Sequence, residues 1–193
     1  MAHQGLAADQ KKAHRLGLEI VFYDEFGFSF QEPLGRTWAP RGQPPIIRRL
    51  TRYRREISTA VGLTLSGKIY LRHFFHAMRR QHVVTALQHI RRHVAAGFIL
   101  IWDRAPTHRA KVVQAYLAEH PEIIVEWLPS YAPDLNPEEY CHGNVKQHLK
   151  NILPEDKFVI RKLLNAQFAR IRRQPELILS FFHHAGLRVK QLS

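Results

Sequence analysis

The sequence predicts an α/β fold in which a mixed five-stranded sheet is flanked by helices and followed by a helical C-terminal extension. Short apolar runs bounded by turn residues, which are typical of strands, alternate with longer segments that have the apolar spacing of helices. Three of the short runs precede the first such helix, so the sheet is expected to begin with consecutive antiparallel strands. With 193 residues, 45% of them apolar, the chain can form one domain with a substantial core.

The first three expected strands form a meander. Residues 18–26 contain the apolar run that begins it. Residues 56–65 and 68–75 follow as two further strands, joined by a Ser-Gly turn. Residues 81–95 then place apolar side chains at helical spacing, which predicts the first helix.

A strand, a helix and a further strand come next. Residues 98–102 are entirely apolar and predict a buried strand, residues 110–120 predict a helix, and residues 123–128 predict the last strand. A final helix of this domain begins near residue 136. Three strands, a helix, a strand, a helix, a strand and a helix is the order of the ribonuclease H-like fold.

The chain is expected to divide into three parts. Residues 1–17 form a short polar N-terminal segment, residues 18–153 the ribonuclease H-like domain, and residues 154–193 a basic helical extension. In the extension, apolar residues at helical spacing are interrupted by Pro175. This predicts two helices that pack on the sheet or cover its edge.

Three acidic residues stand out in this arrangement. Asp24 and Asp103 each end one of the most apolar strands, and Glu139 lies just inside the last helix of the domain. Active sites of open sheets gather at strand ends, so the two aspartates are expected to lie side by side. Mg2+ binds carboxylate and water oxygens, and two such ions can stabilise the attacking and leaving oxygens of a phosphodiester displacement.

The segment before Glu139 predicts how that carboxylate is presented. Asn136 is a favourable N-cap residue, and Pro137 is favourable at the first helical position. Glu138 and Glu139 therefore fall in the first turn, where exposed N–H groups and the helix dipole favour an ionised carboxylate. The helical phase places Glu138 nearer the apolar face than Glu139.

Each carboxylate also has a purely structural explanation. Asp24 and Asp103 could cap the turns that follow their strands. Glu139 could reach back to the N-cap amide as in a capping box. The explanations weaken when taken together, because the chain has only five aspartates and two of them end its most apolar strands.

Four segments occur in order at compatible spacing, namely residues 23–28 (YDEFGF), 36–42 (RTWAPRG), 102–108 (WDRAPTH) and 128–139 (LPSYAPDLNPEE). Together they resemble bacterial insertion-sequence transposases of the mariner-type DDE superfamily. The resemblance implies that residues 18–153 are a DDE catalytic domain. It also implies that Asp24, Asp103 and Glu139 are the catalytic and metal-binding triad, with two Mg2+ ions as cofactors and Mn2+ as a substitute.

Two features depart from the family pattern. Arg104 follows the second aspartate, where the family often has Asn, but this position does not hold the metal. The second feature is a spacing: 35 residues separate Asp103 from Glu139, whereas 34, the commoner number in the superfamily, separate it from Glu138. We assign the triad to Glu139 because it occupies the acidic position of the motif and loop length can vary by one.

The rest of the chain is strongly basic. Lys and Arg number 29 against 16 Asp and Glu, and the formal charge of +13 indicates a polyanionic partner such as DNA. No apolar run approaches the roughly 20 residues of a membrane-spanning helix, and the N-terminus has no signal-peptide core. We therefore expect a cytoplasmic, nucleoid-associated protein. The thirteen histidines show no metal-binding spacing and are expected to be surface or phosphate-facing residues.

A set of basic residues is expected to contact DNA. Most fall between Glu32 and Glu56, a run with seven arginines and no acidic residue, which would repel itself without an anionic partner. His108 is expected to touch a phosphate, to orient the carboxylate of Asp103, or to have a structural role at the start of a helix. The expected DNA contacts are Arg36, Arg41, Arg48, Arg49, Arg52, Arg54, Arg55, His108 and Lys146.

The function that the resemblance implies is DNA transposition, in which water cuts the element end and the freed 3′-OH attacks target DNA. A homodimer in a transposition complex is expected. Full-length family members carry an N-terminal helix-turn-helix, for which residues 1–17 are too short. Three explanations are open: a separate helix-turn-helix polypeptide supplies it, a frameshifted reading frame encodes it, or it has been lost. Two alternatives remain open: another ribonuclease H-like nuclease, such as a junction resolvase or a ribonuclease, and a catalytically inactive DNA-binding remnant.

Overall fold

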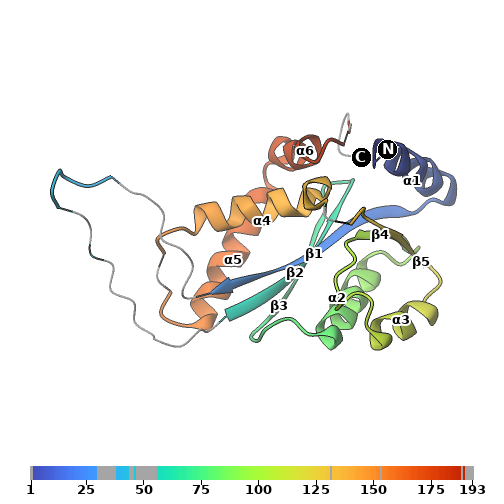
Figure 1. The fold of residues 1–193 in the computed structure, drawn as a ribbon, viewed down its shortest axis with the longest axis horizontal. Coiled ribbons are helices and arrows are strands. Elements are labelled where there is room, and N and C mark those ends of the chain that lie inside the picture. Colours follow the sequence, from blue (N-terminus) through green and yellow to red (C-terminus); the bar gives the residue numbers. More distant parts are fainter. Residues whose placement is uncertain are drawn as a thin grey trace.

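A single five-stranded mixed sheet runs through the molecule in the order β3-β2-β1-β4-β5 (Figure 1). The computed structural model describes residues 2–29, 38–43, 46, 56–130, 132–152, 154–187 and 189. Strands β1, β2 and β3 are antiparallel neighbours, whereas β1, β4 and β5 are parallel. The strand bounds are β1 Glu19–Ser29, β2 Glu56–Thr64, β3 Ile69–Phe74, β4 Phe98–Trp102 and β5 Ile123–Trp127.

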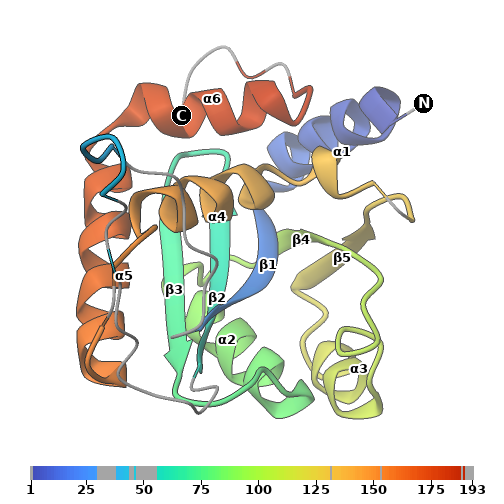
Figure 2. The same cartoon turned by 60° about the vertical axis from the view of Figure 1, so that its left-hand side comes forward.

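Helices cover both faces of this sheet (Figure 2). Helices α2 and α3 pack on one face, and α4, α5 and α6 pack on the other. A short 3-10 turn, Pro133–Leu135, precedes α4. The helix bounds are α1 Ala2–Leu16, α2 Arg80–His93, α3 Lys111–Ala118, α4 Pro137–His148, α5 Lys157–Arg172 and α6 Pro175–His184. The ribonuclease H-like α/β fold predicted from the order of elements is confirmed.

Strand β1 separates the two cores because successive side chains of a strand point to opposite faces. Ile20 and Phe22 pack in the cluster beneath α4, α5 and α6. Val21 and Tyr23 pack in the cluster beneath α2 and α3. A strand buried on both faces is apolar without alternation, which explains its continuous apolar run.

The C-terminal helices complete the core on the α4 side of the sheet. Phe168 of α5 packs against Phe26 of β1, with ring centroids 6.2 Å apart. Phe182 of α6 meets Phe22 edge to face at 5.7 Å. The two helices expected on either side of Pro175 are therefore present and packed on the sheet. Among the described residues, none of the helices combines the length and apolar character needed to cross a bilayer.

Two elements differ from the expectation. Strand β1 continues three residues past residue 26 because β2 pairs with it as far as Ser29, opposite Glu56. The N-terminal segment, expected only to be short and polar, forms helix α1. Ala13 of α1 is buried and Lys12 forms an ion pair with Glu126 at 2.8 Å, so contacts with the sheet hold this helix.

Candidate active site

Two aspartates come together where the parallel pairing of β1 with β4 ends; Asp103 follows β4, whereas Asp24 lies in the middle of β1, which continues to Ser29. Phe22 of β1 pairs with Ile101 of β4. The same register continued by two residues sets Asp24 beside Asp103. The alternation of β1 turns Asp24 toward α4, and both aspartates line one cleft together with Glu139.

Asn136 begins helix α4 and also holds Asp24. Its side-chain oxygen accepts a hydrogen bond from the N–H of Glu138 at 3.2 Å, which confirms the predicted N-cap. Its amide nitrogen donates to Oδ2 of Asp24 at 3.3 Å. The N–H of Asn136 donates to the Pro133 carbonyl at 2.8 Å, so the Glu139 side chain does not make the capping-box bond to this N–H. Glu139 is left to face the strand.

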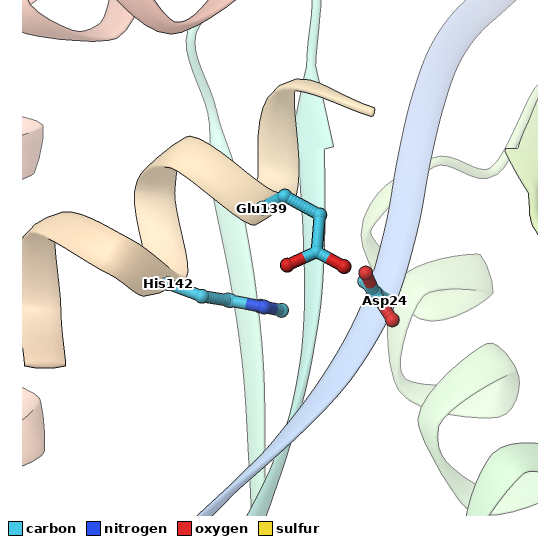
Figure 3. A group of neighbouring side chains, drawn as sticks. All are labelled: Asp24, Glu139 and His142. Carbon is cyan, nitrogen blue, oxygen red and sulfur yellow. The ribbon is translucent and has the colours of Figure 1, made fainter. Parts of the chain in front are cut away.

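Glu139 lies across from Asp24 and has a histidine beside it (Figure 3). Asp24, Glu139 and His142 each offer one ligand atom, and these atoms lie within 4.8 Å of one another. His142 stands three residues after Glu139, the spacing that puts two side chains on one face of a helix. We had expected the histidines to be ordinary surface or phosphate-facing residues. The i, i+3 spacing from Glu139 was the signal that could have identified His142.

Three carboxyl groups, those of Asp24, Glu138 and Glu139, lie close together on the β1 side of the cleft. Burial raises the pKa of Asp24 to about 7; His142 opposes this shift and Glu139 adds to it. Glu138 is fully buried, and burial raises the pKa of its carboxyl well above the ordinary value. The structure thus separates the adjacent glutamates, with Glu139 exposed at the cleft and Glu138 buried behind it.

Asp103 sits in a different environment. Its Oδ1 lies 2.7 Å from Nδ1 of His108, and Nε2 of His108 lies 3.1 Å from Glu25. The His108 ring stacks on Trp102 at 4.3 Å. Asp103 also accepts a hydrogen bond from the N–H of Ala105 at 2.9 Å, so it does cap the turn after β4.

The two partners shift each other's pKa. The hydrogen bond from His108 lowers the pKa of Asp103. Burial alone would lower the pKa of His108, but its bonds to Asp103 and then Glu25 outweigh burial and raise it to about 10. His108 is 1% exposed, so its geometry suits orientation of Asp103 and leaves little surface for a phosphate. Glu25 was not anticipated as a member of the site.

The expected DNA contacts fall into two groups. Arg41 and Lys146 are exposed, and the Nζ of Lys146 lies 5.8 Å from the centre of the Phe26 ring. Arg104 and Arg109, which we did not predict as site residues, line the cleft. The remaining predicted contacts lie outside the described residues, namely Arg36, Arg48, Arg49, Arg52, Arg54 and Arg55.

The strand order and the helices on both faces define a ribonuclease H-like α/β protein. The chain belongs to the DDE superfamily endonuclease family, whose model matches residues 19–158. Similar solved structures include a pre-cleavage Mos1 transpososome, with 21% identity over 97% of this chain and 61% of that chain and a TM-score of 0.66. The catalytic domain of Mos1 mariner transposase has 19% identity over 97% of this chain and 91% of that chain, with a TM-score of 0.60.

At these identities the likeness establishes the fold. The chain spans about 61% of the length of the chain in the Mos1 transpososome. A search of curated proteins gave no match.

Proposed function

We propose that this chain is the catalytic domain of a DNA transposase, which cuts DNA at the ends of a transposable element and joins those ends to target DNA. The observation that carries the proposal is the convergence of Asp24, Asp103 and Glu139 on one cleft of a DDE endonuclease fold. The similar structures include complexes described as a pre-cleavage transpososome and a strand transfer complex of Mos1, which supports cutting followed by joining.

The donor set at the cleft fits Mg2+ or Mn2+. Asp24, Asp103 and Glu139 supply the carboxylate oxygens; burial, with a smaller contribution from Glu139, raises the pKa of Asp24, and a bound cation would favour its ionised form. Mos1 paired-end complexes with Mg and with Mn are among the similar structures. Asp24, Asp103 and Glu139 would hold two such cations, which would supply an activated water and stabilise the leaving oxygen.

The protein's own residues position these groups. Asn136 fixes Asp24 through its amide, and His108 fixes Asp103 through its ring. Arg104 and Arg109 line the same cleft and bind the phosphate that is cut, since guanidinium groups match phosphate oxygens in a bidentate manner. In this assignment the catalytic and metal-binding residues are Asp24, Asp103 and Glu139.

The proposed partners are DNA, a second copy of the chain and a helix-turn-helix polypeptide. The charge of +13 favours DNA, and the paired-end complexes of Mos1 support a dimeric assembly around two element ends. The helix-turn-helix reads the element ends, whereas the basic residues of this chain bind the backbone without sequence preference. We infer that the protein acts in the cytoplasm at the nucleoid.

The test is a cleavage and joining assay with Mg2+ or Mn2+. The purified chain, with and without a candidate helix-turn-helix partner, is incubated with duplexes that carry the repeats flanking its gene. We expect cation-dependent nicks that expose a 3′-OH, followed by joined products, and neither product with Asp24→Asn. Cleavage confined to branched DNA or RNA–DNA hybrid would identify a resolvase or a ribonuclease. DNA binding without any cleavage would identify an inactive remnant.

A further inference from the structure

A buried glutamate and a buried histidine lie directly behind the cleft carboxylates, on successive turns of helix α4. Oε2 of Glu138 and Nε2 of His142 are 2.9 Å apart. Glu138 is 0% exposed and His142 is 4% exposed. The contact is not aligned as a hydrogen bond, and within the described part of the chain neither oxygen of Glu138 nor Nε2 of His142 has a hydrogen-bond partner.

Such a pair is costly for a fold. A buried polar group without a partner destabilises the folded state by about 1–3 kcal/mol. Apolar side chains in these two positions would pack against the same core, which already contains Cys141 and Val145 of α4. The requirement that keeps Glu138 and His142 polar therefore lies outside the packing of the core.

The cleft in front of the pair gives the reason why Glu138 and His142 are polar. A ring nitrogen of His142 lies within 4.8 Å of carboxylate oxygens of both Asp24 and Glu139 (Figure 3). Three donor atoms this close together can belong to one cation site. The ring of Phe26, with its centroid 4.4 Å from that of His142, holds the imidazole in this place.

We propose that His142 is a nitrogen ligand of the cation held by Asp24 and Glu139, and that Glu138 fixes the imidazole from behind. Histidines bound to metals usually donate their other ring N–H to a carboxylate, which sets the orientation of the ring. This assignment rests on the proposed function, because it needs the cation that the cleft carboxylates bind. It adds a nitrogen donor to the two carboxylates of this site.

The nitrogen ligand makes the site selective among divalent ions. Mg2+ prefers oxygen ligands in octahedral geometry, whereas imidazole suits transition-metal ions. The cation bound by Asp24, Glu139 and His142 is therefore a transition-metal ion such as Mn2+ in preference to Mg2+. The second cation position, at Asp103, lacks this histidine and shows no preference for Mn2+ over Mg2+.

The experiment measures Mn2+ binding to the full chain by calorimetry and by pulsed electron paramagnetic resonance. We expect nitrogen coupling to bound Mn2+ in the wild-type chain and its loss in His142→Phe, with the ratio of Mn2+ to Mg2+ affinity falling on the order of tenfold. Glu138→Gln keeps the shape of the side chain and weakens Mn2+ binding on the same order. His148→Phe is the matched control, because His148 is exposed on the same helix, and it leaves both readouts unchanged.

The wild-type spectrum decides the question even if a buried variant fails to fold. Mn2+ bound to the wild-type chain without nitrogen coupling would overturn the assignment of His142 and leave the proposed function standing, provided that cleavage is observed. Nitrogen coupling that persists in folded His142→Phe would also overturn it. A chain that neither binds Mn2+ nor cuts DNA would contradict both proposals.

Discussion

The two sides of the cleft differ in how their charges are balanced. On the β4 side, Asp103 is paired with His108, which Glu25 supports from behind. On the β1 side, Asp24, Glu139 and Glu138 gather around His142, and burial raises the pKa of Asp24 to about 7. On the β4 side the carboxylate has a histidine partner within the protein, whereas on the β1 side we propose that a bound cation supplies the positive charge. Two neighbouring aspartates of one cleft can therefore differ in the direction of their pKa shift: the pKa of Asp24 is raised and that of Asp103 is lowered.

The largest effect should separate the adjacent glutamates on the β1 side. Glu139→Gln should lower the cleavage rate at least about 10³-fold, a barrier change of about 4 kcal/mol, because it removes a ligand charge at the cleft. Glu138→Gln should stay within about tenfold at saturating cation, since the buried carboxyl acts only through His142. Single-turnover cleavage measures both rates. The reverse order would mean that the 34-residue spacing identifies the catalytic glutamate.

A smaller effect is expected on the β4 side. His108→Gln should lower the cleavage rate about 10–100-fold, because Asp103 loses the partner that orients it. His120→Gln serves as the control, since His120 lies away from the cleft beside Glu122. The measurement is the single-turnover rate at saturating Mn2+ together with the melting temperature. An unchanged cleavage rate in a folded His108→Gln chain would mean that His108 does not contribute to cleavage.

The stability of the metal-free protein should change in opposite directions on the two sides. The pKa of Asp24 is raised from 3.8 to about 7, so stability is lost as pH rises through this window, and Asp24→Asn should stabilise the fold above pH 7. The pKa of Asp103 is lowered, chiefly by its hydrogen bond with His108, so Asp103→Asn should destabilise the fold at the same pH. Asp24→Asn should raise the Tm by about 2–4 °C, and Asp103→Asn should lower it by less, because the Asp103 side chain is 55% exposed and solvent screens its interactions. Thermal unfolding in EDTA at pH 8 measures it, and shifts of the same sign would contradict the comparison.

The smallest effect concerns phosphate contacts on the two sides. Lys146→Ala on α4 and Arg109→Ala beside Asp103 should each reduce the slope of log K against log[salt] by about 0.9 on duplex DNA. Both should weaken binding equally for unrelated sequences, because backbone contacts carry no sequence information. Salt-titrated fluorescence anisotropy on two unrelated duplexes gives both quantities. An unchanged slope in one variant would mean that the substituted residue does not contact a phosphate.

Much of the fold could be predicted because its signals are local. The five apolar residues of β4 and the Asn-Pro start of α4 are properties of short segments, and both elements were predicted at their observed positions. The end of β1 could not be predicted, because Ser29 is in the strand only through its pairing with Glu56 of β2. Helix α1 was missed for a similar reason, since the ion pair between Lys12 and Glu126 joins distant parts of the chain.

The site was predictable to the extent that position along a strand or helix determines it. Asp24 follows the apolar run of its strand and Asp103 follows its strand in the sequence, and the structure places both on the same cleft as Glu139. His142 and Glu25 carry no such local mark, because a histidine among thirteen gains meaning only when its neighbours in space are known. The cluster of seven arginines could be recognised from the sequence alone, but the charge of a segment does not determine where its side chains lie in the fold.

The Asn136 side chain makes the geometry of the cleft inseparable from the start of helix α4. One amide both caps the helix and binds Asp24 of a strand that lies more than a hundred residues earlier. A chain in which α4 has not begun at Pro137 therefore lacks the proposed cation site as well. Folding and assembly of the site are therefore coupled: the proposed active centre forms only in a molecule whose helix and sheet have already docked.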